Sequence, residues 1–284
     1  MDEKLPRQEW WRRAYASDRY MQSLSDLEVD LRFADIFTNQ IILTPEGKLG
    51  IFGIQWMEKF THVMEELAIR GRGFPHADQL GDRLASPQAI RSEIGAKVRG
   101  RYPKGVPDRF MLFKYGKREH LEALLARGQL RLSPASAYKD PSLNVAIADN
   151  ELTFEKIRGK HRTRYEMRGD FYCFCSAWLH SDRLVSDFEA TAVLVIREPH
   201  EFFLRLVTCL DRRDDEIRFN RVTYIDPLLL DEHDVTDLPF VKHMRFTYQL
   251  EHRWVAEPRD PKERLTRVEL NLGSIEDIAE IYVA

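Results

Sequence analysis

Cysteine is scarce in this chain of 284 residues, which contains only Cys173, Cys175 and Cys209. A small and odd number argues against a disulfide framework and indicates a reducing compartment. No apolar run approaches the roughly 20 residues that cross a bilayer. The opening residues, MDEKLPRQEWWRR, also lack the apolar stretch of a secretory signal. We therefore expect a cytoplasmic protein that makes no membrane contact.

Several widespread catalytic signatures are also missing. The chain has no Walker phosphate loop, no Gly-x-Gly-x-x-Gly after a strand, no His-Glu-x-x-His and no Gly-x-Ser-x-Gly. Cys173, Cys175 and His180 lack the fourth ligand and the regular spacing of a zinc site, so no metal is expected. The net charge is only −3, so any contact with nucleic acid must come from a local patch.

What is present indicates a globular protein with two units. Hydrophobic residues make up 43% and charged residues 31% of the chain, enough apolar mass for a core. The spacing of apolar residues predicts helices over 8–37 and 54–70, with a hairpin over 41–52. The stretch 100–108 (GRYPKGVPD) reads as a linker. We therefore expect a mostly helical N-terminal unit with a hairpin over 1–100 and a second unit over 108–284.

The second unit is predicted to consist mainly of strands. Helices are expected over 117–127 and 199–210, and residues 134–170 look polar and irregular. Few helices among many strands favour an α+β fold over a doubly wound sheet. The expected strands cover residues 110–115, 130–133, 171–176, 190–197, 217–225, 246–256, 267–272 and 278–283.

Three segments of the second unit stand out together. The first holds Phe113-Lys114-Tyr115-Gly116, then Gly128 to Ser133 (GQLRLS) and Ala137 to Pro141 (AYKDP). The second is Tyr172 to Trp178 (YCFCSAW), and the third is Lys242 to Arg253 (KHMRFTYQLEHR). In this order they resemble an uncharacterised bacterial family found in toxin and phage-defence settings. The resemblance covers residues 110–256, and the layout is in turn similar to ADP-ribosyltransferases.

This resemblance implies a C-terminal ADP-ribosyltransferase-like mixed sheet domain that uses NAD. Glu251 would be the catalytic carboxylate, supported by Gln249 and Ser176. The residues that would hold the cofactor are Lys114, Tyr115, Ser133, Tyr138, Asp140 and Arg253. ADP-ribosyltransferases usually carry Arg or His in the first motif, where this chain has Lys-Tyr.

The chemistry gives a reason for these residue types. Cleaving the nicotinamide–ribose bond develops positive charge on the ribose, which a carboxylate can stabilise. Gln249 and Glu251 are two residues apart, so we expect them on one face of a strand. Arg253 would lower the pKa of Glu251 by pairing with it. Lys114 and Tyr115 are adjacent in a strand, so at most one is expected to reach a given cleft.

The most basic stretch runs from Lys156 to Arg168 (KIRGKHRTRYEMR). As a polar loop it could contact the phosphates of a nucleic-acid acceptor, or it could be a solvated surface loop. The sequence thus favours an NAD-dependent ADP-ribosyltransferase-like effector of a toxin–antitoxin or anti-phage system. The N-terminal unit would bind a neutralising or sensing partner, or cover the cleft.

Two other readings stay open. The absence of Arg or His from the first motif favours a catalytically inactive module for ligand sensing or protein interaction. A metal-dependent nuclease could instead use Glu251, Asp140 and nearby carboxylates around a divalent ion.

Overall fold

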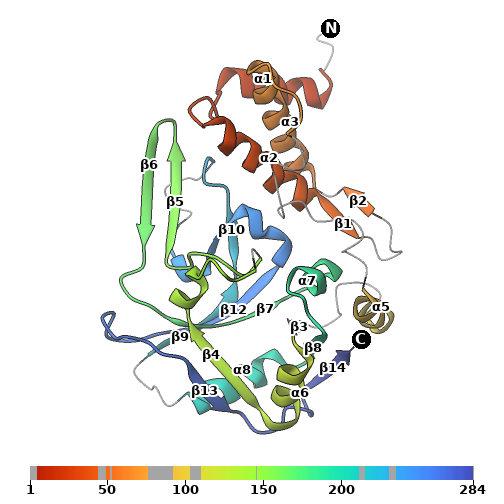
Figure 1. The fold of residues 1–284 in the computed structure, drawn as a ribbon, viewed down its shortest axis with the longest axis vertical. Coiled ribbons are helices and arrows are strands. Elements are labelled where there is room, and N and C mark those ends of the chain that lie inside the picture. Colours follow the sequence, from red (N-terminus) through yellow and green to blue (C-terminus); the bar gives the residue numbers. More distant parts are fainter. Residues whose placement is uncertain are drawn as a thin grey trace.

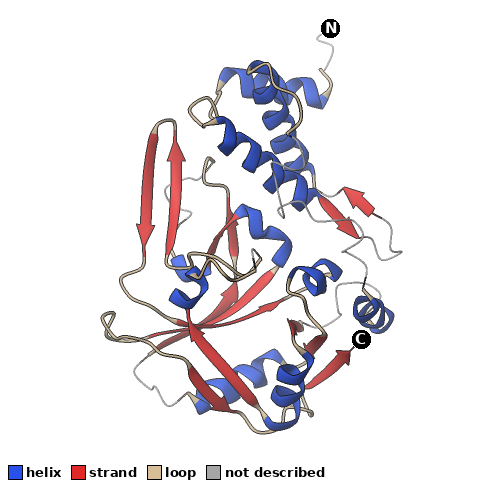
Figure 2. Cartoon of the chain, viewed as in Figure 1, coloured by secondary structure: helices blue, strands red, loops and turns tan. Residues whose placement is uncertain are grey.

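The computed structural model describes residues 5–43, 49–51, 53–75, 92–102, 110–144, 146–210, 215–229 and 235–283. Helices come first in the chain and a mostly sheet part follows, as Figures 1 and 2 show. The predicted α+β class is thus confirmed. The turn of the predicted 41–52 hairpin and most of the 100–108 linker lie outside the described residues.

The described residues of the N-terminal unit up to residue 75 form three helices and two short paired strands. The predicted helix over 8–37 is interrupted, because Ser25 and Glu28 start a new helix by bonding each other reciprocally. Gly71 follows the third helix with φ +69°, the left-handed conformation that glycine allows. The elements are α1 (Arg7–Ser17), α2 (Asp26–Gln40), β1 (Ile41–Leu43), β2 (Leu49–Ile51) and α3 (Ile54–Ile69).

The core of the helical unit includes a residue from the far end of the chain. Tyr15, Val29, Phe33 and Leu67 pack together, and Met244 joins the same buried cluster. The two parts of the chain therefore share apolar packing.

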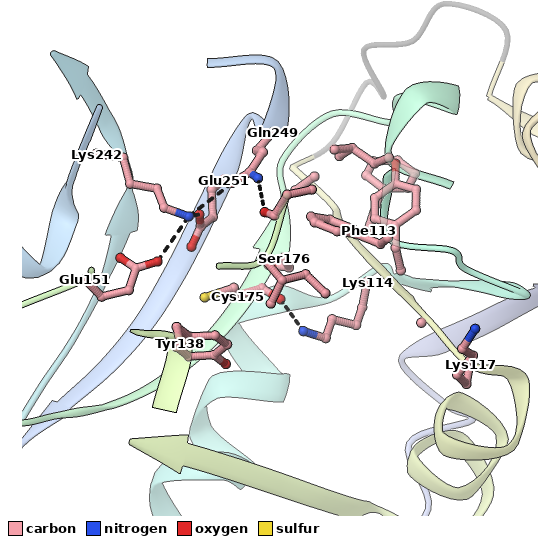
Figure 3. A pocket seen from close by; sticks show the side chains of 17 residues that line it. Phe113, Lys114, Lys117, Tyr138, Glu151, Cys175, Ser176, Lys242, Gln249 and Glu251 are labelled. Carbon is pink, nitrogen blue, oxygen red and sulfur yellow. Dashed lines mark hydrogen bonds and ion pairs between the residues drawn. The ribbon is translucent and has the colours of Figure 1, made fainter. Parts of the chain in front are cut away.

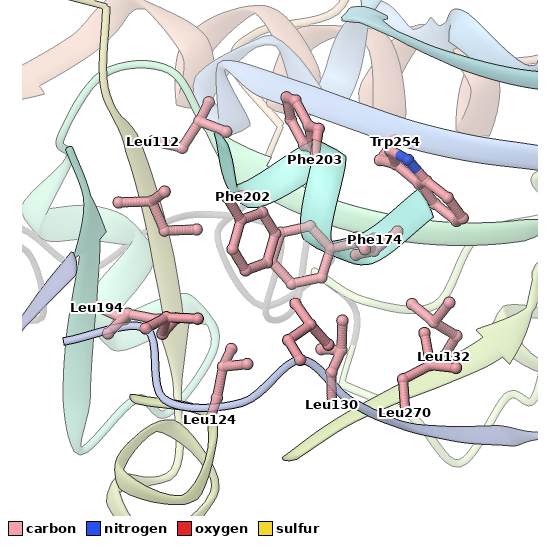
Figure 4. Close-up of a cluster of buried hydrophobic side chains, with 14 of the residues drawn as sticks. Leu112, Leu124, Leu130, Leu132, Phe174, Leu194, Phe202, Phe203, Trp254 and Leu270 are labelled. Carbon is pink, nitrogen blue, oxygen red and sulfur yellow. The ribbon is translucent and has the colours of Figure 1, made fainter. Parts of the chain in front are cut away.

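The largest sheet in the described residues of the second part is antiparallel and has eight strands. Its helices α6 (Arg118–Arg127) and α8 (Pro199–Cys209) pack on one face around the buried cluster of Figure 4. Helices α5 (Glu93–Arg101) and α7 (Asp182–Asp187) pack on the other. The strands are β3 (Leu112–Gly116), β4 (Gln129–Pro134), β7 (Tyr172–Ala177), β8 (Ala192–Ile196), β9 (Glu216–Arg221), β12 (Glu251–Glu257), β13 (Val268–Asn271) and β14 (Ala279–Val283).

The sheet branches at β7. One edge of β7 pairs with β12 from Tyr172 to Ala177. The other edge is shared: β4 pairs with Tyr172 and Cys173, whereas β3 pairs only with Ala177. No described strand pairs with 174–176 at this second edge, so β3 and β4 diverge from each other there.

Residues 134–170 are not irregular, contrary to the prediction. They contain a 3₁₀ turn, η2 (Ala135–Lys139), and an antiparallel hairpin of β5 (Thr153–Arg158) and β6 (His161–Glu166). Gly159 has φ +58° in the two-residue turn, which suits the tight turns that join such strands.

The predicted strand over 246–256 is also shorter than expected. Residues Met244–Gln249 form a 3₁₀ helix, η4, and β12 starts only at Glu251. Before it, β10 (Thr223–Ile225) pairs in parallel with β11 (Val241–His243), which follows η3 (Leu238–Phe240).

Candidate functional site

A cavity of about 360 Å³ opens beside the branch of the sheet. Strands β3, β7 and β12 bring the three sequence motifs to its walls, as Figure 3 shows. Six of the nine predicted site residues line it: Lys114, Tyr115, Tyr138, Ser176, Gln249 and Glu251.

Glu251 is the first residue of β12 and is 5% exposed. Arg253 Nε donates to its Oε1 at 2.6 Å, and Lys242 Nζ donates to its Oε2 at 3.0 Å. Burial alone would raise the pKa of Glu251, but Arg253 and Lys242 hold that pKa well below its usual range. Glu251 is therefore an ionised carboxylate over the physiological pH range.

Two site residues were missed from the sequence, Glu151 and Lys242. Lys242 Nζ lies 3.1 Å from Glu151 Oε1, and Arg253 reaches Glu151 Oε2 at 2.6 Å. Together with Glu251 they form a buried ring in which each carboxylate contacts both cations. Burial would lower the pKa of Lys242, but Glu151 and Glu251 raise it well above its usual value. The ring thus sets two carboxylates against two basic side chains, so its formal charges balance.

Gln249 reaches the cavity by a different route from the one predicted. It ends η4, and Leu250 then adopts a left-handed conformation with φ 49° before β12 begins at Glu251. Gln249 Oε1 accepts from Lys242 Nζ at 3.1 Å, and its Nε2 donates to the Ala146 carbonyl at 2.7 Å. The left-handed turn at Leu250, rather than alternation along a strand, therefore brings Gln249 and Glu251 to the same cavity.

Both residues of the first motif line the cavity, although at most one was expected to. Lys114 Nζ crosses the gap between β3 and β7 and donates to the Cys175 carbonyl at 2.7 Å. The Tyr115 hydroxyl accepts from the Ser181 amide at 2.9 Å and is hydrogen-bonded to His180 Nδ1 at 3.0 Å. Divergence of the strands at the branch makes room for both side chains.

Ser176 lies between the first and third motifs. It is buried, and its Oγ donates to the His252 carbonyl of β12 at 3.2 Å. Ser176 thus contacts the backbone next to Glu251 rather than the carboxylate itself.

Three predicted residues lie outside the cavity lining. Ser133 is in the ladder opposite Cys173. Asp140 is exposed, and its Oδ1 accepts from the Ser142 amide at 2.9 Å, as in an ordinary turn. Arg253 has no exposed surface and acts on the site only through the two carboxylates that it contacts.

The remaining walls are largely apolar. Phe113, Tyr138 and Phe188 line the cavity with aromatic surface, and Leu184 of α7 adds an aliphatic side chain. Lys117, exposed at the start of α6, also belongs to the lining. The cavity thus combines an apolar slot with one buried charged wall.

No group of three or more His, Cys, Asp or Glu side chains among the described residues is placed to hold a metal ion. No helix in this part of the chain combines the length and apolar character needed to cross a membrane. Comparison of the chain with family models, curated proteins and solved structures gave no match.

Proposed function

We propose that the protein transfers ADP-ribose from NAD, with Glu251 as the catalytic carboxylate. One observation carries the proposal: Lys114, Ser176 and Glu251, which are far apart in the sequence, lie on three neighbouring strands and line one cavity. Their motifs are the ones that resemble ADP-ribosyltransferases. The same resemblance suggests a bacterial toxin–antitoxin or anti-phage setting.

The cavity suits the nicotinamide half of NAD. Its volume of about 360 Å³ is near the lower end of small-molecule sites, roughly 300–1,000 Å³. The aromatic side chains of Phe113, Tyr138 and Phe188 offer flat surface to the nicotinamide ring. Lys114 and Lys117 supply positive charge for the phosphates.

The carboxylate is prepared for the bond-breaking step. As the C–N bond of the nicotinamide riboside breaks, nicotinamide leaves with the electron pair and the ribose becomes cationic. Glu251, held ionised by Arg253 and Lys242, stabilises this charge, and each of its oxygens keeps a lone pair for a ribose hydroxyl. The acceptor then bonds to the ribose carbon and releases a proton. Arg253 is a positioning residue in this scheme.

A ligand-sensing module is the second candidate, and the charged ring is the observation that favours it. Both oxygens of Glu251 already contact cations, and the first motif lacks the usual Arg or His. Such a module would bind NAD without releasing nicotinamide.

The nuclease reading gains no support from the geometry. Asp140 is outside the cavity lining. The ammonium of Lys242 lies 3.0–3.1 Å from the carboxylates of Glu251 and Glu151, where it already fills the space between them.

A neutralising or sensing partner would act most directly through the N-terminal unit. Asp226, which follows β10, accepts from Arg32 of α2 and Lys59 of α3 at 2.5–2.9 Å. Displacing these helices would disturb β10, and Tyr224 of β10 accepts from the Glu251 amide at 2.7 Å.

The test measures nicotinamide release from NAD by the purified protein. Wild type is expected to release nicotinamide, and Glu251→Gln to lose about 100-fold or more of the rate. Glu122→Gln, on the exposed surface of α6, is the matched control and should keep the wild-type rate. Binding of NAD without release would support the sensing module instead. Equal rates in wild type and Glu251→Gln would refute the role given to Glu251.

A further inference from the structure

The hairpin of β5 and β6 concentrates positive charge in a chain that is acidic overall. The ten residues from Lys156 to Tyr165 contain five Lys or Arg and no Asp or Glu, whereas the whole chain has a net charge of −3. In Figure 1 the hairpin extends from the sheet alongside α2. These cations could bind a partner only where carboxylates of the fold do not already neutralise them.

One face of the hairpin is neutralised and held against the helical unit. Arg162 pairs with Glu28 of α2 and, at 2.8 Å, with Glu155. Arg164 pairs with Glu166 at 2.6 Å. These two arginines alternate along β6 and share a face, because side chains two apart in a strand point the same way.

The opposite face keeps its charge. Lys156 and Arg158 lie on it, opposite Thr163 and His161 in the register, and Lys160 follows in the turn. Within the described residues, none of these three cations pairs with a carboxylate. We call Lys156, Arg158, Lys160 and His161 the basic face.

The basic face is held in place rather than carried on a loose loop. Ser23 Oγ donates to the Gly159 carbonyl at 2.5 Å, and the Ile157 amide donates to the Pro227 carbonyl at 2.8 Å. At the base, Phe154 is buried against Ile225. Because the backbone that carries the cations is already ordered, only their side chains lose conformational freedom on binding a partner.

We propose that the basic face binds the phosphate backbone of a nucleic acid. Lys and Arg that no described carboxylate neutralises, at regular spacing along a rigid strand, are suited to a polyanion with repeated phosphates. An anionic membrane fits less well, because no large hydrophobic side chain of the hairpin is exposed to insert among lipids.

The hairpin also connects directly to the cavity. Glu151, in the cavity wall, precedes the first residue of β5 by two positions. At about 3.3 Å per residue, the tip of β5 lies roughly 20 Å along the chain from Glu151. A nucleic acid that ran from the basic face along β5 toward its base would reach the cavity, and it would then be the acceptor of ADP-ribose. This last step alone rests on the proposed function.

Binding is tested without NAD, by fluorescence anisotropy of labelled 20-nucleotide single-stranded DNA, duplex DNA and RNA at 50–200 mM salt. Wild type should bind at least one of them, with affinity that falls as salt rises. The double variant Lys156→Glu/Arg158→Glu should lose about 10-fold or more in affinity. The slope of its log affinity against log salt concentration should decrease by the amount expected for about two lost phosphate contacts.

The matched control is Lys262→Glu/Arg264→Glu, which makes the same charge change at exposed positions elsewhere and should bind like wild type. The assay contains no NAD, so a failed transferase test leaves this one intact. Circular dichroism checks that each variant is folded. Absence of binding at 50 mM salt, equal losses in both double variants, or binding only to phosphatidylserine vesicles would overturn the proposal.

Discussion

The side chain of Asn39 in α2 is hydrogen-bonded to the backbone of Tyr248 in η4. Asn39 Oδ1 accepts from the Tyr248 amide at 2.9 Å, and Nδ2 donates to the carbonyls of Arg245 at 3.0 Å and Met244 at 3.3 Å. The next residue, Gln249, contacts Lys242 in the cavity. A single amide side chain of the helical unit thus holds the segment that ends in the site.

Replacing Asn39 should loosen this segment. Asn39→Ala leaves the Tyr248 amide without its partner, so we expect a loss of about 1–3 kcal/mol in the free energy of unfolding. Hydrogen exchange should accelerate in peptides covering 244–250 and stay unchanged in β8. Asn220→Ala, at an exposed position of β9, is the control. Unchanged exchange in 244–250 would show that Asn39 does not hold η4.

Asp226 should matter far more to stability than a surface carboxylate with a similar partner. Asp226→Asn leaves Arg32 and Lys59 without their anion in a buried place, so we expect a loss of about 3–5 kcal/mol. Asp277→Asn breaks the exposed pair with Arg205 and should cost much less, because solvent screens an exposed ion pair. Urea unfolding at pH 7 measures both, and similar losses in the two variants would contradict the prediction.

The charged ring predicts strong coupling between Lys242 and Glu151. Lys242→Met leaves two buried carboxylates facing one cation and should cost about 3–5 kcal/mol. Adding Glu151→Gln restores the balance of charge, so the double variant should be more stable than Lys242→Met alone. A double-mutant cycle by urea unfolding measures the coupling. Simple additivity would mean that the two side chains do not interact in solution.

Stability should fall as the pH is lowered from about 6.5 to 4. Burial and nearby Arg99 lower the pKa of His180 to about 4, and burial and nearby Arg221 lower that of His252 to about 4. The unfolded chain therefore binds protons in this window that the folded protein does not, and the loss is on the order of a few kcal/mol. His252→Phe should flatten the dependence of urea midpoints on pH. An unchanged slope would show that the pH dependence of stability arises from groups other than His252.

Much of the fold could be predicted from local patterns. The helix over 117–127 and the one over 199–210 were found because their apolar residues recur at helical spacing, and Gly128 ends the first with φ 67°. The buried strands β7 and β8 were found because they are nearly continuous apolar runs.

The elements that were missed lack such a pattern. Strand β6 (HRTRYE) is mostly exposed, so charged residues occupy one of its faces, mainly polar residues occupy the other, and no apolar alternation marks it. Apolar and polar residues do alternate over 246–250, but the left-handed Leu250 breaks the strand for a reason that only tertiary contacts reveal. Glu151 and Lys242 could not be recognised from the local sequence, because only the folded chain brings the two side chains together.

The shared packing of Met244 bears on how the protein unfolds. Because Met244 completes the core of the helical unit while Asn39 and Asp226 tie that unit to η4 and β10, melting of the helices would remove support from the cavity in the same event. Heat or denaturant should therefore give one cooperative transition rather than two. A segment with the composition of a linker therefore need not separate two units that unfold independently.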